Sequence, residues 1–258
     1  MLINPLYSIA GVLVGTLVGL TGVGGGSLMT PLLVLAFGFH PATAVGTDLL
    51  YASATKTVGT AVHGMHGTVD WRVVRRLAAG SVPATALTLL VLARAQHQMR
   101  DAGHVIALAL GAALLLTAVA MFFRGRLVRA LAPQFAALGD RRVGHITVLL
   151  GALLGVLVSL SSVGAGALGM TALLILYPHL PVNRLVGSDI AHAVPLTLIA
   201  GIGHWAMGSV DMSLLLSLLA GSIPGIILGS FLSSRTSDRV LTPILAITLA
   251  IVGAKMLF

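Results

Sequence analysis

The chain has 258 residues, of which 57% are hydrophobic and only 9% are charged, whereas soluble domains contain about 25% charged residues. This balance excludes a soluble fold. The formal net charge of +8 does not indicate a nucleic-acid-binding protein, because such a protein gathers Lys and Arg on a polar face. Cysteine is absent, which excludes disulfides, thiolate chemistry and cysteine-ligated metals. The composition therefore predicts an integral membrane protein.

Eight charge-poor runs are long enough to cross a membrane, for which a helix needs roughly 20 apolar residues. Two shorter runs, of about 11 residues each, follow glycine-rich interruptions and span only half a bilayer. The prediction is an all-α integral membrane protein with about eight long transmembrane helices and two half-helices. The long runs cover residues 6–22, 45–62, 73–92, 105–123, 146–161, 186–207, 212–232 and 241–257, and the short runs cover residues 27–37 and 167–177.

The second half of the chain repeats the first at an offset of 140 to 141 residues. The Val-Gly-Thr-Asp motif that ends at Asp48 matches the Val-Gly-Ser-Asp motif that ends at Asp189, and further Asp, His and Pro residues recur at the same offset. Apolar sequence does not produce such matches by chance. We therefore predict two homologous repeats, residues 1–123 and 145–258, joined by an Arg-rich cytoplasmic linker over residues 124–144.

The relative orientation of the repeats depends on whether the short runs also cross the membrane. Four crossings in each repeat make the repeats parallel, and five make the second repeat inverted. Cytoplasmic segments are enriched in Lys and Arg. The inverted arrangement brings Arg184, Arg235 and Arg239 to the side of the Arg-rich linker, so it is the favoured one.

The two glycine-rich breaks predict an anion-binding site. Each break leaves backbone N–H groups and the positive dipole end of a short helix, and discontinuous helices of two repeats meet near the bilayer midplane in many transporters. The structural alternative is that the glycines only permit a tight turn or a helix crossing. The residues predicted to bind the substrate are Gly24, Gly25, Gly26, Gly164, Gly166, Thr21, Ser27, Ser161, Ser162 and Lys56.

Asp48 and Asp189 lie inside apolar spans, where a charge at the bilayer centre costs roughly 2.5 to 3.5 kcal/mol. We predict that they serve proton coupling or gating; a helix cap or an interhelical hydrogen bond is the structural alternative. His192 lies one turn from Asp189, and His63 and His204 occupy matching positions near the ends of their spans. These histidines join the coupling or gating prediction, with a plain interfacial position as the alternative.

Other chemistry is not indicated. No nucleotide-binding Gly-x-x-x-x-Gly-Lys-Ser/Thr loop occurs, and Glu is absent, which removes the His-Glu-x-x-His zinc motif. The His and Asp residues near the span ends lack a repeated ligand set. We predict no enzyme activity, no cofactor and no metal.

The segment Gly-Leu-Thr-Gly-Val-Gly-Gly-Gly-Ser at residues 19–27, the Ala-Val-Gly-Thr-Asp that ends at Asp48 and the Gly-Thr-Val-Asp-Trp at residues 67–71 resemble the sulfite exporter TauE/SafE family of membrane permeases. The resemblance covers essentially the whole chain. It implies a multi-pass transporter of the bacterial cytoplasmic membrane for sulfite, sulfoacetate or related organosulfonates, driven by the proton gradient. Because Ala165 and Ala167 stand where the first copy has Gly25 and Ser27, the two half-sites differ chemically.

The expected partners are a small anionic substrate, the lipid bilayer and protons, without nucleic acid; a homo-oligomer is left open. Two other functions fit the same sequence. One is an anion channel, in which paired half-helices line a continuous pore. The other is a non-transporting membrane subunit for assembly or sensing.

Overall fold

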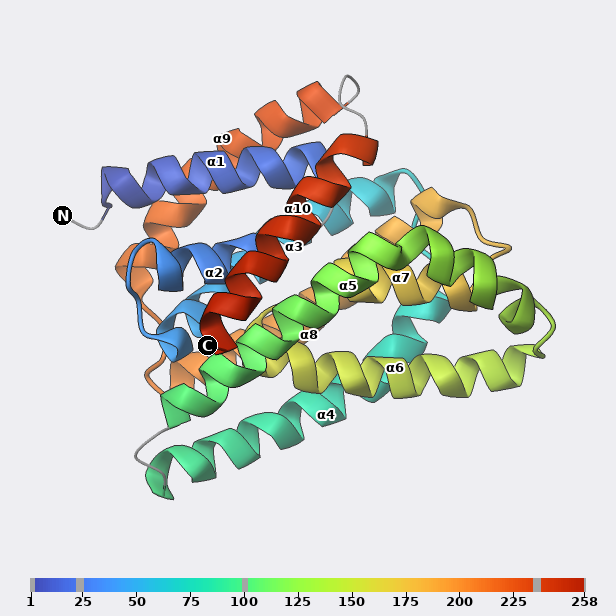
Figure 1. Ribbon diagram of the computed structural model, residues 1–258, viewed down its shortest axis with the longest axis horizontal. Helices are drawn as coiled ribbons and strands as arrows, with labels where there is room; N and C mark the ends of the chain where they lie inside the picture. Colours follow the sequence, from blue (N-terminus) through green and yellow to red (C-terminus); the bar gives the residue numbers. More distant parts are fainter. Residues whose placement is uncertain (1–2, 22–25, 99–101, 234–237, 258) are drawn as a thin grey trace.

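The computed structural model describes residues 3–21, 26–98, 102–233 and 238–257. All regular secondary structure in these residues is α-helical, which confirms the predicted all-α fold (Figure 1). The helices are α1 (Pro5–Thr21), α2 (Gly26–Leu35), α3 (Pro41–Met65), α4 (Trp71–Gln98), α5 (Ala102–Ala136), α6 (Asp140–Ser161), α7 (Ala167–Leu176), α8 (Val182–Ala206), α9 (Met212–Ser233) and α10 (Asp238–Leu257).

Each predicted apolar run falls largely within one helix, and the two half-helices are α2 and α7. In the described ranges, four helices are long and apolar enough to cross a membrane, namely Trp71–Ala95, Ile106–Ala136, Asp140–Ser161 and Val182–Ala206. Shorter apolar helices cover Pro5–Leu17, Ala167–Leu176, Met212–Leu228 and Ala246–Leu257. The total of about eight spans therefore stays a prediction. Helix α3 is long, but it carries Asp48, Lys56 and several threonines and is not among these four.

The exterior of the protein is apolar and its interior carries polar side chains. Leu13, Leu149 and Ile251 are 63%, 69% and 64% exposed, whereas charged and hydroxyl side chains are buried. A soluble protein shows the opposite distribution, because burying a charge or a hydroxyl is costly. Apolar side chains on the outside suit contact with lipid. The buried polar residues include Thr30, Asp48, Ser81, Thr85, Thr117, Asp189, His192 and His204.

The helices pack in pairs around a central pair, α3 and α8. Helix α1 packs along α9, α6 packs along α4, and α5 packs along α10 (Figure 1). Glycines permit the closest of these contacts: a Cβ on Gly80 of α4 would overlap the Val148 carbonyl oxygen of α6, and a Cβ on Gly221 of α9 would overlap the Ser8 carbonyl oxygen of α1. Small residues of this kind let membrane helices approach until their backbones touch.

Helices at corresponding places in the two halves run in opposite directions. In Figure 1, α1 starts beside the N-terminus and runs away from it to the right, whereas α6 runs from right to left. Helix α10 likewise runs back toward the side from which α5 starts.

The Arg-rich segment expected as a linker is mainly helical. Helix α5 continues to Ala136 and α6 begins at Asp140, so that residues 137–139 alone separate them. Arg and Ala have high intrinsic helix propensity, which explains why the helix extends beyond its apolar part. The cytoplasmic location of this segment stays a prediction.

Candidate functional site

The second half of the chain contains a sharp break between α6 and α7. Ser162 follows the last residue of α6 and has a left-handed backbone with φ 58°, and Gly164 has φ 114°. The Ser161 hydroxyl donates to the Leu157 carbonyl at 2.6 Å and accepts the Val163 N–H at 3.2 Å. Ser161, predicted to bind the substrate, is therefore engaged in stabilising the break itself.

This break is buried and leaves the amino-terminal end of α7 without a side-chain cap. Its residues Val163 and Ala165 are 0% and 3% exposed, as expected for non-helical backbone at membrane depth, which must be buried in protein or line a cavity. The first backbone hydrogen bonds run from Gly169 N to Gly164 O and from Met170 N to Gly166 O. The N–H groups at the start of a helix have no intrahelical partner, so this end can receive an acceptor group.

In the first half, α1 is described to Thr21 and α2 from Gly26, and residues 22–25 lie outside the described residues. Gly24 and Gly25 lie outside the described residues, and so do the side chains of Thr21 and Ser27. The prediction that these residues bind a substrate therefore stays untested.

Asp48 is the eighth residue of α3 and is completely buried. Thr30 of the half-helix α2 donates a hydrogen bond from Oγ1 to Asp48 Oδ2 at 2.5 Å. The other oxygen, Oδ1, has no hydrogen-bond partner. Ser162 lies close enough to act on this carboxylate, and its own buried hydroxyl also lacks a partner. Asp48 therefore joins α3 to α2 by an interhelical hydrogen bond, the structural alternative named for it, and lies close to the α6–α7 break.

Asp189 is the eighth residue of α8 and is 5% exposed. It lies against the backbone of the other half-helix, because a Cβ on Gly169 of α7 would come within 2.5 Å of Asp189 Oδ1. That oxygen has no hydrogen-bond partner. Each buried carboxylate thus touches one half-helix, Asp48 with α2 and Asp189 with α7.

Lys56 brings a positive charge into the same region. Its side chain is buried, and it attracts Asp189 and, more weakly, Asp48. Within the described residues, no ion pair closer than 4.0 Å joins Lys56 to either carboxylate. Arg124 of α5 also acts on Asp189. One ammonium therefore attracts two carboxylates without a close ion pair to either.

The three predicted histidines occupy different surroundings. His192 is fully buried, lies within the field of Lys56, and shares a hydrogen bond of 2.9 Å between Nε2 and the Ser81 hydroxyl. His204 is buried and donates from Nε2 to the Ser159 carbonyl at 2.9 Å. His63 lies near the end of α3 with Nδ1 2.8 Å from Thr68 Oγ1. Only His192 thus lies in the cluster around Lys56.

The family model of the sulfite exporter TauE/SafE family matches residues 7–256. The chain belongs to the sulfite exporter TauE/SafE family. This confirms the resemblance that the glycine-rich and Val-Gly-Thr-Asp motifs carry. The protein is a multi-pass membrane transporter and not an enzyme.

Among its relatives, this TauE/SafE family member is 42% identical over 209 residues to the probable membrane transporter protein YjnA of Bacillus subtilis (strain 168), which covers 79% of this chain and 80% of the relative. Over shorter stretches it is 40% identical to the probable membrane transporter protein YunE of the same organism, across 68 residues, 26% of this chain and 25% of the relative. It is 29% identical across 87 residues to a probable membrane transporter protein of Xylella fastidiosa (strain 9a5c), 34% of this chain and 33% of the relative. No solved structure is a significant match.

Three residues of the buried cluster in this TauE/SafE family member are absent from the sequence prediction: Thr30, Gly169 and Tyr51. Tyr51 could have been found from the repeat, because it matches His192 at the offset of 141 residues. Ser222, the counterpart of Ser81, lies near Tyr51 as Ser81 lies near His192. Thr30 also matches Thr171 at the same offset, but its bond to Asp48 depends on how the helices pack. Gly169 has no such match, because the offset places it at Leu28 or Met29.

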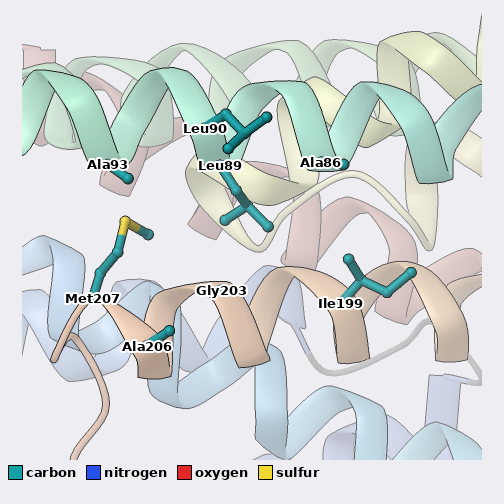
Figure 2. A pocket seen from close by; sticks show the side chains of 8 residues that line it. All are labelled: Ala86, Leu89, Leu90, Ala93, Ile199, Gly203, Ala206 and Met207. Carbon is teal, nitrogen blue, oxygen red and sulfur yellow. The ribbon is translucent and has the colours of Figure 1, made fainter.

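An apolar groove of about 840 Å³ lies between the carboxy-terminal parts of α4 and α8. Figure 2 shows Leu89 of α4 pointing toward α8, and Met207, which follows α8, pointing toward α4. A groove without charged or hydroxyl side chains offers no donors to an anion, so we do not assign it to the substrate. Its lining residues are Ala86, Leu89, Leu90, Ala93, Ile199, Gly203, Ala206 and Met207.

Proposed function

We propose that this TauE/SafE family member is a proton-coupled secondary transporter for small sulfur-containing anions, such as sulfite, sulfoacetate or related organosulfonates, in a bacterial cytoplasmic membrane. One observation supports this proposal most strongly. The buried start of α7, with the unpartnered Ser162 hydroxyl beside it, lies next to two buried carboxylates at equivalent helix positions.

The substrate site consists of groups that donate hydrogen bonds or carry positive charge. The free N–H groups of Ala167 and Leu168 at the start of α7, the Ser162 hydroxyl and the Lys56 ammonium are such groups. Sulfite and sulfonate each present several acceptor oxygens on one sulfur, and a helix amino terminus suits oxyanions of this kind. Gly164 and Gly166 allow the backbone to turn there. The second half of the site comes from the residues predicted in the first repeat, Thr21, Gly24, Gly25, Gly26 and Ser27.

The two halves, residues 1–123 and 145–258, form inverted repeats in this proposal. The opposite directions of α1 and α6 and of α5 and α10 support it. The packing of α1 on α9 corresponds to the packing of α6 on α4 when the halves are exchanged. Inverted repeats of this kind commonly move against each other around a central site, which gives alternating access.

Coupling follows from the contacts of the carboxylates. Asp48 is bonded to Thr30 of α2, and Asp189 lies against Gly169 of α7. Binding or loss of a proton at either carboxylate changes how that half-helix is held, and thereby the site at its start. His192 lies beside Lys56 and belongs to this group, whereas His63 and His204 act in gating near the helix ends.

Ligand-dependent stabilisation of the purified protein tests the proposal. We expect sulfite, sulfoacetate and methanesulfonate to raise the unfolding temperature in a concentration-dependent manner, because a ligand that binds only the native state stabilises it. Chloride at equal ionic strength is the control. Stabilisation by chloride equal to that by the sulfur anions, or by none of these anions, contradicts the proposed substrate class.

A further inference from the structure

The centre of the protein holds two buried acidic side chains and one buried basic side chain. Asp48, Asp189 and Lys56 are 0%, 5% and 8% exposed. An uncompensated charge inside a protein costs several kcal/mol, and in a membrane such residues pair with one another or serve transport. A single ammonium stands between two carboxylates, and its counterpart in α8 is Thr197, whose hydroxyl donates to the Ala193 carbonyl. The repeat therefore duplicates the carboxylate but not the cation.

The two carboxylates differ in how much they depend on Lys56. Asp189 is attracted by Lys56 and also by Arg124. Within the described residues, Lys56 is the one cation that acts on Asp48. Asp48 receives the Thr30 hydrogen bond on Oδ2, while Oδ1 is buried without a partner. If Lys56 pairs with another anion, Asp189 still has Arg124 as a counter-charge, whereas Asp48 has no other cation among the described residues.

The remaining titratable groups around Asp48 can be assigned by helix. Helix α8 contributes Asp189 and His192, α5 contributes Arg124, and α3 itself contributes Tyr51 and Lys56. Helix α2 contributes the neutral Thr30. At the start of α9, the Asp211 carboxylate accepts the Leu214 N–H and its backbone N–H donates to Thr47, so Asp211 acts as a helix cap. None of these groups replaces Lys56 as a counter-charge for Asp48.

We propose that Lys56 links anion binding to proton binding. When an anion binds at the start of α7, the Lys56 ammonium pairs with that anion instead of Asp48, and Asp48 then binds one proton from solution on Oδ1. This inference rests on the proposed function. The proton forms an O–H bond at Asp48, and the two new charges, one on the anion and one on the proton, cancel. Anion and proton therefore enter and leave the site together.

Calorimetric titration of the purified wild-type protein tests this link. Methanesulfonate is the probe, since it has no titratable group near neutral pH, and the titration is repeated in buffers that differ in ionisation enthalpy. We expect uptake of about one proton for each anion bound, because linkage equates proton uptake with the change in protonation between the two states. Binding without proton uptake, or binding that requires sodium instead, overturns the inference and counts against proton coupling, but leaves transport of sulfur-containing anions standing. Absence of binding by any sulfur anion counts against the proposed function, and the inference fails with it.

Two variants assign the proton. Asp48→Asn is expected to bind methanesulfonate without proton uptake, since it cannot ionise. Lys56→Gln is expected to bind the anion more weakly and also without proton uptake, because Asp48 then lacks its counter-charge before the anion arrives; it serves as the second test if Asp48→Asn does not fold. Asp140→Asn, which changes an exposed carboxylate at the start of α6, is the matched control and keeps the wild-type uptake. Unchanged proton uptake in Asp48→Asn overturns the assignment to Asp48.

Discussion

The backbone N–H of Asp70 donates a hydrogen bond of 2.8 Å to the hydroxyl of Ser188, across 118 residues of sequence. The matching N–H of Asp211 donates to the Thr47 hydroxyl at 3.1 Å. Thr47 and Ser188 each precede a buried Asp. Asp70 precedes α4 of the first half and is bonded to Ser188 of the second half, and Asp211 precedes α9 of the second half and is bonded to Thr47 of the first half. Each half thus uses the residue beside its buried carboxylate to hold the other half in place.

These reciprocal bonds predict equal losses of stability. Thr47→Val and Ser188→Ala should each lower the free energy of unfolding by about 1 kcal/mol, because each leaves one backbone N–H without its partner. Thermal unfolding in detergent measures the effect. Thr88→Val is the control, since the Thr88 hydroxyl donates to Ala84 in its own helix. A loss in one variant only would show that the two contacts are not equivalent.

The glycines next to these residues lie in equally tight contacts. A Cβ on Gly46 would overlap the Ser209 carbonyl oxygen, and a Cβ on Gly187 would overlap the Thr68 carbonyl oxygen. We expect Gly46→Ala and Gly187→Ala to lower stability by about 1 to 3 kcal/mol or to prevent folding, as overpacked cores do. Gly125→Ala, with open space around the new methyl group, should be neutral or stabilising. Yield and unfolding temperature report the difference, and wild-type stability in Gly46→Ala would contradict the packing described.

Substitutions of the two serines at the α6–α7 break should have different effects, on anion binding for Ser162 and on stability for Ser161. Ser162→Gly relieves the left-handed backbone and removes a hydroxyl without a partner, so the unfolding temperature should not fall. Loss of a hydrogen bond to a charged ligand should weaken anion binding by about 1.5 to 3 kcal/mol, or tenfold and more. Ser161→Ala should lower stability, because its hydroxyl supports the break. Binding titrations of Ser162→Gly with wild-type affinity would remove Ser162 from the site.

Arg76 ties three helices together at one end of the molecule. Its guanidinium donates to Asp140 Oδ2 at 2.6 Å and to the Tyr177 hydroxyl at 3.2 Å, and the Tyr177 hydroxyl lies 2.7 Å from Thr147 Oγ1. Tyr177→Phe should lower stability by about 1 kcal/mol at all salt concentrations, since this hydroxyl is buried.

Asp140→Asn should act differently, because its carboxylate is exposed and screened by salt. We expect a small fall in the unfolding temperature at low salt that disappears at about 1 M, where the Debye length is about 3 Å. Unfolding temperatures of both variants across a salt series measure this. Salt dependence in Tyr177→Phe, or its absence in Asp140→Asn, would contradict these contacts.

The sequence was sufficient to predict the helices, because apolar runs of membrane length have few other solutions. The two half-helices and the break before Ala167 followed from glycine and length alone. The extension of α5 to Ala136 was missed, since the last turns carry Arg residues that end an apolar run without ending a helix. Hydropathy identifies the apolar part of a helix, but it does not show where the helix ends beyond that part.

The candidate site could be predicted only in part. Asp48, Asp189 and Lys56 stood out because charged residues are costly inside apolar spans. The roles of Thr30 and Gly169 could not be predicted, since they depend on which helix packs against each carboxylate. Ser161 and Ser162 look alike in sequence, and only the direction of each hydroxyl separates the supporting residue from the one that faces Asp48.

The most direct test is uptake of labelled sulfoacetate into proteoliposomes with an imposed pH gradient and a clamped membrane voltage. A proton-coupled transporter should accumulate sulfoacetate above its equilibrium concentration, with a rate that saturates, and accumulation should collapse when the pH gradient is dissipated. A flux that rises linearly with sulfoacetate concentration and never exceeds equilibrium would show a channel and contradict secondary transport.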